Sequence, residues 1–269
     1  MPTELPFFQV DAFADRPFTG NQAGVMPLDR WLDDATLQAI ANENNVAETA
    51  FFIPSGDPDA DYDLRWFTPA VEVALCGHAT LASGYHVLTR DSSRERVRFR
   101  TRHSGILEVR RDGDRLAMEL PAWPSRETDP APLATALGVN VEAVYETIDA
   151  PEPSRMAILK DATAVRALAP DFRAIGALGG VLAIATAPGD GGYDVVSRVF
   201  ASAAGIDEDP VTGSAHSMLT PYWVKRLGRD SFSAFQASKR GGALHCTLAG
   251  DRVVLGGTCV TTIEGVFRI

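Results

Sequence analysis

The sequence predicts an α+β protein built from two similar halves, each a set of strands around one buried helix. Val71–Leu88 and Gly205–Trp223 both pass from a short polar segment into a mostly apolar run, and in the second the polar segment, Asp207–Pro210, is expected to be an acidic loop. Neither run carries Asp, Glu, Lys or Arg between positions 73 and 89 or 211 and 224. A helix without a charged face has no solvent side, so both helices should be central and buried. Elsewhere strand patterns outnumber helical ones, which favours α+β over alternating βαβ units.

An internal repeat supports the two halves. Residues 105–120 and 242–257 share a Gly, a Leu and a Gly-Asp-Arg triplet at a constant offset of 137 residues. The glycines that begin the two apolar runs, Gly77 and Gly213, are 136 residues apart, and the triplets that begin at Arg65 and Arg198 are 133 apart. Common strand–turn patterns could coincide by chance, but near-constant spacing over three features predicts two homologous halves.

The expected domains are 1–121 and 122–269, with central helices near 77–89 and 213–226. The boundary lies in Pro121–Pro132, which holds four prolines and is the best linker candidate. Asp33 and Asp34 are placed to cap a helix that runs to about Asn42. A short helix before Gly138 should stop at that glycine. The final strand, 260–269, extends beyond the second repeat and could return to the first domain.

Composition excludes several classes of partner. The net charge of −10, with no strong Lys/Arg cluster, argues against nucleic acid and anionic membranes. No apolar run reaches membrane-spanning length, and the first residues do not resemble a signal peptide. The three cysteines are an odd number without metal spacing, which favours a reducing compartment. We therefore expect a cytoplasmic protein that does not bind nucleic acid or membranes.

Four polar side chains stand where chemistry could occur. Glu48 lies in an apolar strand, Asp209 precedes the second central helix, and His78 and Ser214 each follow the glycine that begins a central helix. Pseudo-symmetric halves often place such matching ends at their interface, where ligand clefts form. Helix N-termini at such a cleft present backbone N–H groups and the positive ends of helix dipoles. This arrangement predicts a small anionic substrate with a carboxylate.

Each candidate also has a structural explanation. Glu48 could lie at a strand edge with its carboxylate in water, although burial would make it a competent proton carrier near neutrality. His78 and Ser214 could cap their helices, which is the better explanation for Ser214 taken alone. Asp209 before Pro210 is a common turn element. Cys76 could be an ordinary buried residue, although a helix start favours its thiolate.

Other chemistries have little support. Cys76 and His78 are two residues apart, a spacing that does not bring side chains of a helix together, so a cysteine–histidine pair is poorly supported. Glycine-rich nucleotide loops and a Gly-x-Ser-x-Gly elbow are absent. No set of His, Cys and carboxylate residues has metal spacing. Proton transfer by side chains alone, with no cofactor and no metal, remains.

Five motifs together resemble the phenazine-biosynthesis PhzF-like family. They are Val10-Asp11-Ala12-Phe13, Gly20-Asn21-Gln22-Ala23-Gly24-Val25, Asn45-Val46-Ala47-Glu48-Thr49-Ala50-Phe51, Cys76-Gly77-His78-Ala79-Thr80 and Glu208-Asp209-Pro210-Val211-Thr212-Gly213-Ser214-Ala215-His216. They follow the family's order, and the repeat extends the match almost to the end of the chain. As a set they are specific, whereas singly only the Asp-Pro-x-Thr-Gly-Ser element is.

The resemblance implies a diaminopimelate-epimerase-like fold, with two barrel-like domains around central helices and an active site between them. It also implies a cofactor-independent isomerase, often a homodimer, which in the founding enzyme moves a proton on trans-2,3-dihydro-3-hydroxyanthranilate. The family's catalytic glutamate falls on Glu48, and its supporting polar residues fall on His78, Asp209 and Ser214. The substrate-binding positions we expect are Asn21, Cys76, Gly77, Thr212 and Gly213.

Cys76 keeps a rival function open. It stands where related epimerases and racemases carry one cysteine of a catalytic pair, but the second half has Asp209-Pro210-Val211-Thr212 at the matching place. A two-thiol racemase is therefore disfavoured, whereas an epimerase or racemase that pairs Cys76 with Asp209 remains an alternative. A second alternative is a non-catalytic binding or regulatory protein on the same fold. The resemblance favours the isomerase.

Overall fold

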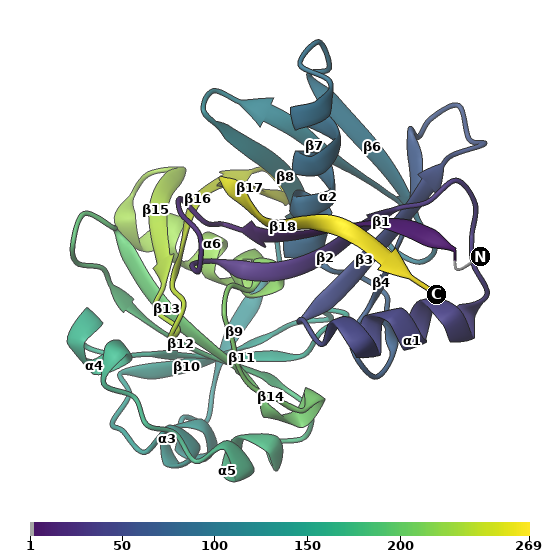
Figure 1. Cartoon of the computed structure of the whole chain (residues 1–269). Coiled ribbons are helices and arrows are strands. Elements are labelled where there is room, and N and C mark those ends of the chain that lie inside the picture. The colour runs from purple at the N-terminus through teal and green to yellow at the C-terminus, as the bar shows by residue number, and fades with distance from the viewer. Residues whose placement is uncertain (1–2) are drawn as a thin grey trace. The chain divides into compact units, whose positions relative to one another are not determined.

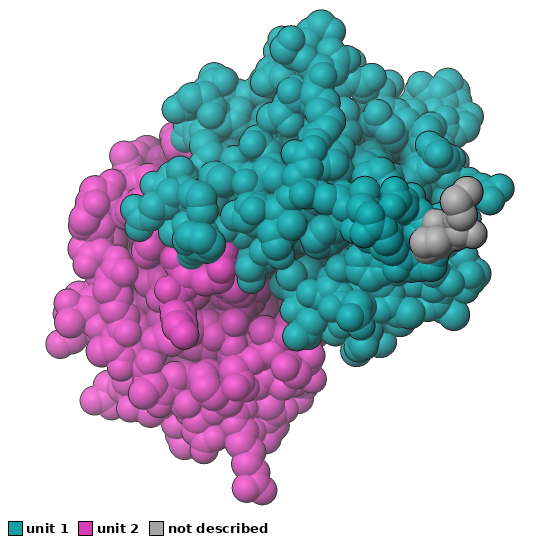
Figure 2. Space-filling model, viewed as in Figure 1, with its two compact units in different colours: residues 1–119, 256–269 teal, residues 120–255 magenta. Residues whose placement is uncertain are grey.

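The computed structural model describes residues 3–269 and confirms the α+β class. The chain forms two compact units, residues 1–119 with 256–269 and residues 120–255 (Figures 1 and 2). Each unit holds one long helix that is buried along most of its length, α2 (Gly77–Arg90) in unit 1 and α6 (Gly213–Leu227) in unit 2. None of the helices within residues 3–269 has the length and apolarity needed to cross a membrane.

Unit 1 is a mixed sheet with α2 packed on it. Its remaining elements are β1 (Glu4–Ala12), β2 (Asn21–Pro27), α1 (Asp34–Asn44), β3 (Glu48–Pro54), β4 (Tyr62–Phe67), β5 (Glu72–Val73), β6 (Arg96–Thr101), β7 (Ile106–Asp112), β8 (Arg115–Pro121) and β18 (Cys259–Arg268). Strand β1 pairs antiparallel with both β2 and the C-terminal strand β18, which Figure 1 shows in yellow beside β1. The last strand of the chain thus joins the first strand.

Unit 2 contains β9 (Ser125–Thr128), α3 (Ala131–Leu137), β10 (Ala143–Thr147), β11 (Ser154–Ile158), α4 (Ala162–Arg166), α5 (Phe172–Gly176), β12 (Leu182–Pro188), β13 (Val195–Ala201), a 3-10 turn (Ser202–Ala204), β14 (Ile206–Asp209), α6, β15 (Ser231–Gln236), β16 (Gly242–Ala249) and β17 (Arg252–Gly257). Its pairings reproduce those of unit 1. β11 pairs parallel with β12, β12 antiparallel with β13, β13 parallel with β15 and β15 antiparallel with β16. β2, β3, β4, β6 and β7 follow the same alternation. The two halves therefore share a topology as well as a sequence pattern.

Helix α2 is enclosed by strands, as its charge-free sequence predicted. It packs against β1, β2, β3, β6, β7 and β18. Gly84 allows the closest approach to a strand, because a Cβ atom at this position would lie 2.5 Å from the Cβ of Val109 in β7. Leu81, Ala82 and Leu88 are fully buried on the same helix. The helix is thus the core of unit 1.

Two local predictions about helix ends are confirmed. Asp33 is the N-cap of α1, where its carboxylate accepts a hydrogen bond from the backbone N–H of Thr36 at 3.0 Å. Helix α3 ends at Leu137, and Gly138 follows in the left-handed region with φ of 69°. In both places one residue type satisfies a specific backbone requirement, which a sequence can reveal.

Two segments differ from the prediction. The proline-rich stretch 121–132 is more than a linker, because it contains β9, which pairs antiparallel with β10. The acidic segment before α6 is not a loop throughout, because Ile206–Asp209 forms β14, which pairs antiparallel with β13. Acidic residues suggest a solvated loop only when no cation faces them, and here Arg198 binds Glu208.

Candidate active site

Glu48 and His78 face each other in unit 1. Glu48 is the first residue of β3, and His78 lies in the first turn of α2. Oε2 of Glu48 lies 3.2 Å from Nε2 of His78, and the two side chains are only 15% and 7% exposed. The carboxylate is therefore not in open water at a strand edge, which was the alternative explanation for Glu48. Since Cys76 is the N-cap of α2, His78 does not cap the helix either.

The contacts of His78 determine which ring nitrogen carries its proton. Nε2 lies 3.3 Å from the backbone carbonyl oxygen of Gln22, which can only accept, so Nε2 must be the donor. Nδ1 then accepts, and two groups face it, the side-chain amide of Asn21 at 3.3 Å and Sγ of Cys76 at 3.5 Å. The imidazole thus connects Asn21 and Cys76 on one side to Glu48 on the other.

Burial keeps this imidazole neutral. It lowers the pKa of His78 to about 4, against the smaller opposing effect of the hydrogen bond to the Gln22 backbone. At neutral pH a neutral ring therefore lies beside the Glu48 carboxylate, while its Nε2–H donates to the Gln22 carbonyl oxygen. A neutral imidazole that donates at one nitrogen and accepts at the other can pass a proton between its neighbours.

The contact between Cys76 and His78 corrects the sequence-based reasoning. We predicted that a spacing of two residues would keep the side chains apart, which holds inside a helix. Cys76, however, is the N-cap and has an extended backbone, with φ of −143° and ψ of 108°. Its side chain therefore turns toward the ring of His78 instead of following the helix surface. The prediction failed because it assumed that Cys76 lies inside the helix, whereas the helix begins at Gly77.

Three side chains lie close enough to one another to hold a metal ion, although we predicted a site without metal. They are Glu48, Cys76 and His78. Within residues 3–269, this is the one group of three or more His, Cys, Asp and Glu side chains whose ligand atoms lie within 4.8 Å of one another. Sequence spacing missed it because Glu48 comes from a separate strand. Both ring nitrogens of His78 already have hydrogen-bonding partners in Asn21, Cys76 and Gln22, so a site without metal remains our prediction.

In unit 2, Asp209 and Thr212 belong to a network closed by Gln236. Thr212 Oγ1 donates to the Asp209 carboxylate. Gln236 accepts from the backbone N–H of Thr212 at 2.9 Å and donates to the backbone oxygen of Asp209 at 2.8 Å. Gln236 is completely buried at the end of β15. Sequence reasoning missed it, although its inward-facing position in an alternating strand was a usable signal.

The start of α6 argues against the capping explanation for Ser214. Thr212 is the N-cap, Gly213 begins the helix, and Ser214 lies half-buried in the first turn, so Ser214 does not cap the helix. His216 donates from Nδ1 to the Thr212 carbonyl oxygen at 2.8 Å. Burial lowers the pKa of His216 to about 4, so this ring is also neutral. Neither α2 nor α6 has a side-chain cap bond to its first turn within the described chain.

A bidentate arginine–glutamate pair precedes each central helix. In unit 1, Arg65 binds Glu72 through Nε at 2.8 Å and Nη2 at 2.7 Å. In unit 2, Arg198 binds Glu208 in the same way, at 2.6 Å and 2.9 Å. Each guanidinium also lies over the ring of the phenylalanine two residues later, at 4.9 Å and 5.1 Å. We call these two Arg–Glu pairs the twin forks. Each fork fixes the strand that leads into its central helix.

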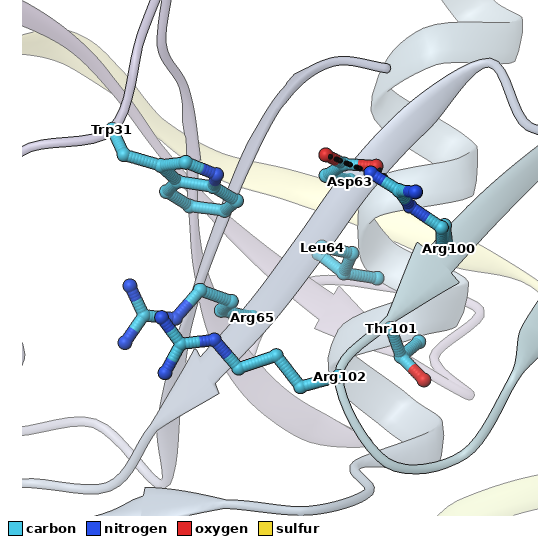
Figure 3. Close-up of a pocket in the computed structure, with 7 residues that line it drawn as sticks. All are labelled: Trp31, Asp63, Leu64, Arg65, Arg100, Thr101 and Arg102. Atoms are coloured by element: carbon cyan, nitrogen blue, oxygen red, sulfur yellow. Dashed lines mark hydrogen bonds and ion pairs between the residues drawn. The ribbon is translucent and has the colours of Figure 1, made fainter. Parts of the chain in front are cut away.

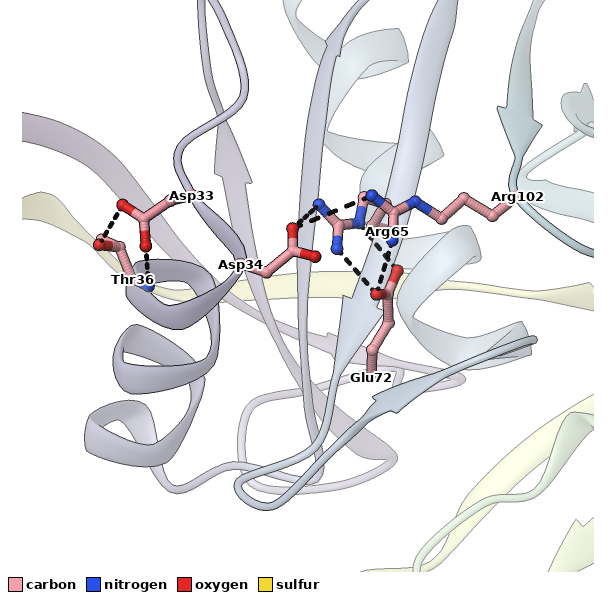
Figure 4. A network of polar contacts seen from close by, with 6 residues as sticks. All are labelled: Asp33, Asp34, Thr36, Arg65, Glu72 and Arg102. Atoms are coloured by element: carbon pink, nitrogen blue, oxygen red, sulfur yellow. Dashed lines mark hydrogen bonds and ion pairs between the residues drawn. The ribbon is translucent and has the colours of Figure 1, made fainter.

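The unit 1 fork extends into a larger polar network. Figure 4 shows Asp34 and Arg102 beside Arg65 and Glu72. Asp34 binds Nη1 of Arg65 at 2.9 Å, and Arg102 donates to Glu72 at 3.0 Å. The hydrogen bond from Arg65 is the first cause of a lowered Glu72 pKa, which keeps this carboxyl group ionised.

The same arginines line a pocket of about 300 Å³ (Figure 3). Its lining residues are Trp31, Asp63, Leu64, Arg65, Arg100, Thr101 and Arg102. Each arginine is paired with a carboxylate, because Arg100 binds Asp63 twice at 2.9 Å and the other two bind Glu72. None of the predicted site residues lines this pocket. We therefore assign these charges to stability and not to anion binding.

Known proteins are similar to this chain over almost its whole length. The family model described as phenazine biosynthesis-like protein matches residues 10–265. An uncharacterized isomerase of Pseudomonas aeruginosa is 47% identical over 99% of this chain and 100% of its own length. A crystal structure of a PhzF-family phenazine biosynthesis protein from Enterococcus faecalis superposes with a TM-score of 0.91, at 40% identity over 99% of this chain and 100% of that one. A hydroxyproline epimerase from Agrobacterium vitis, at 12% identity and a TM-score of 0.63 over 99% of this chain and 93% of that one, shares the fold.

Proposed function

Because the chain belongs to the phenazine biosynthesis-like family and is an isomerase at the level that its relatives share, we propose that it moves a proton on a small carboxylate-bearing substrate. The substrate would be amino-acid-like or cyclic, and no cofactor would take part. Glu48 is the proposed general acid/base, which removes a proton from one carbon and returns it to another. The contact between Glu48 and His78 carries this proposal.

The immediate surroundings of Glu48 suit proton transfer. Its carboxylate is largely buried, and its Oε2 lies 3.2 Å from Nε2 of a neutral imidazole. The ring confines the carboxylate on one side without adding a competing positive charge. A proton carrier with a fixed position contributes typically 10²–10⁴-fold to such a reaction. His78 would thus orient Glu48, and Asn21 would orient His78.

The other predicted residues have proposed supporting roles. Gly77 and Gly213 begin the two central helices, and neither helix has a side-chain cap. Backbone N–H groups at such a helix start favour binding of a carboxylate. Asp209, held by Thr212, would stabilise charge on the substrate together with Ser214. We also propose that the protein is a homodimer that acts on small anions and binds neither nucleic acid nor membranes.

Deuterium uptake from heavy water tests the role of Glu48. Wild type, Glu48→Gln and the control Glu119→Gln would be incubated with trans-2,3-dihydro-3-hydroxyanthranilate and a panel of amino-acid stereoisomers, and uptake followed by NMR. We expect uptake with wild type and the control, and a loss of at least about 10²-fold with Glu48→Gln. Unchanged uptake by a folded Glu48→Gln protein would remove Glu48 from this role. No uptake with any compound would favour a non-catalytic binding protein.

The contact between Cys76 and His78 favours a second candidate function. A thiol beside a neutral imidazole can exchange protons, so the protein could be an epimerase or racemase that uses Cys76 with Asp209. This candidate predicts that amino-acid stereoisomers exchange their α-proton and that Cys76→Ala abolishes the exchange. Uptake that survives Glu48→Gln but not Cys76→Ala would select it over the first candidate.

A further inference from the structure

We propose that Cys76, His78 and Glu48 form a nucleophilic triad, in which Cys76 attacks small electrophilic substrates such as α,β-unsaturated carbonyl compounds. This reactivity is separate from isomerisation and does not rest on the proposed function. Unit 1 alone supplies all three residues, from the N-cap of α2, its first turn and the first position of β3. The triad would make Cys76 a site of covalent modification.

The order of contacts is the one that nucleophilic catalysis requires. Sγ of Cys76 faces Nδ1 of His78 at 3.5 Å, and Oε2 of Glu48 lies 3.2 Å from Nε2 of the same ring, whose N–H donates to the Gln22 carbonyl oxygen. A nucleophile, a base in reach of it and a third group that orients the base define an activated nucleophile, whatever the fold. The hydrogen bond to the Gln22 carbonyl fixes the tautomer that leaves Nδ1 free of hydrogen. The ring is thus already in the state that accepts a proton from the thiol.

The position of Cys76 adds a second contribution. It is the N-cap of a helix of 14 residues, so negative charge that develops on sulfur lies beside the positive end of the helix dipole. Glu48 stabilises the positive charge that develops on the imidazole at the same time. Both effects lower the free energy of the attacking state relative to the resting thiol.

The addition balances without any further reactant. The S–C bond forms at the β-carbon of the acceptor while its C=C π bond breaks, and the thiol proton passes to Nδ1 of His78. The imidazolium then returns that proton to the α-carbon, which restores the neutral ring. With iodoacetamide the S–C bond forms, the C–I bond breaks and iodide leaves, and the thiol proton is lost through His78.

The other two cysteine thiols should react little with an alkylating reagent. Burial raises the pKa of both Cys246 and Cys259 to about 12. Neither contributes appreciable thiolate near neutral pH, so alkylation in this range reports on Cys76. Because Cys76 is itself largely buried, the probe must be small, and iodoacetamide and acrylamide are suitable.

The test measures the rate of Cys76 alkylation by iodoacetamide between pH 6 and 8, with peptide mapping by mass spectrometry to locate the adduct. Wild type, Cys76→Ser, His78→Gln and Glu48→Gln would be compared, each checked by circular dichroism, with Cys246→Ser as the matched control. In wild type, attack assisted by the neutral imidazole should give a rate nearly independent of pH. In His78→Gln the rate should rise about tenfold per pH unit, as for an unassisted thiol.

At pH 6.5 we expect the rate to fall about tenfold or more in His78→Gln and by a smaller factor in Glu48→Gln, while Cys246→Ser matches wild type. Acrylamide, a Michael acceptor, should give the same order among the variants. Absence of a Cys76 adduct in wild type, or equal alkylation rates of wild type and Glu48→Gln at pH 6.5, would overturn the triad. If His78→Gln does not fold, Glu48→Gln decides alone. Isomerase activity is not used as a readout.

Discussion

Removing the charge of Glu208 should destabilise the protein strongly. Glu208 and Arg198 are 17% and 12% exposed, and the guanidinium makes two hydrogen bonds to the carboxylate. In Glu208→Gln, Arg198 stays largely buried and keeps its bond to the Leu168 carbonyl oxygen at 2.7 Å, but no carboxylate faces it. Leaving a buried charge without its partner costs about 3–5 kcal/mol. We expect a loss of about 3 kcal/mol in the free energy of unfolding, because the amide can still accept one hydrogen bond.

The unit 1 fork provides an internal comparison. Arg65 is 3% exposed but also binds Asp34 at 2.9 Å, so Glu72→Gln leaves one carboxylate beside the guanidinium. The loss should therefore be smaller for Glu72→Gln than for Glu208→Gln. Glu119, which pairs with the half-exposed Arg110 at the surface, is the matched control, and Glu119→Gln should change the free energy of unfolding by less than about 1 kcal/mol.

Urea unfolding followed by circular dichroism would measure all three variants, and calorimetry would report the melting temperature. A loss of about 3 kcal/mol corresponds to a fall of roughly 6–12 °C for a chain of this size. The slope of the free energy against urea should stay at the wild-type value, because the surface exposed on unfolding does not change. Equal stability of Glu208→Gln and Glu119→Gln would refute the reasoning, because the fork would then contribute no more than a surface pair.

Two further predictions concern α2. Gly84→Ala should destabilise the protein by about 1–3 kcal/mol, because the new Cβ meets Val109 at 2.5 Å; the double variant with Val109→Ala should recover part of this loss in urea unfolding, and additive losses would contradict the argument. Burial, together with the charge of Arg90, lowers the pKa of His86 to about 4. The folded protein therefore resists protonation, and its stability should be greatest above pH 6.5 and fall as the pH drops toward 4. His86→Gln should show a shallower fall between pH 7.5 and 5 than wild type or the control His103→Gln; parallel curves would exclude His86 as a cause.

The sequence revealed those features that a residue type alone determines. The charge-free runs around Gly77 and Gly213 predicted two buried helices, because a helix that has no charged side chains has no face suited to solvent. Asp33 and Gly138 predicted helix ends for equally local reasons. The repeat could be read because its marker residues stand in strands and turns that pair in the same order in both units.

Features that depend on partners from distant strands could not be read. The hydrogen bonds of His78 to Asn21 and Gln22 join residues 57 and 56 positions apart, and only the pairing of the sheet brings them together. Gln236 is 24 residues from Thr212, and no motif connects them. The acidic segment at Glu208 was predicted as a loop because its cation, Arg198, lies on another strand. Reasoning from spacing within one helix also failed at Cys76, where the backbone had not yet become helical.

The twin forks show what a duplicated chain keeps and what it changes. Both halves retain the Arg–Glu pair and the phenylalanine under it, whereas the residue directly before each helix is a thiol in one half, Cys76, and a hydroxyl in the other, Thr212. The framework that makes each half fold is therefore separable from the residue that stands at the helix entrance. Descendants of such a duplication can acquire a new chemistry through a single codon at a helix entrance, while the strands that carry the entrance inherit their stability unchanged.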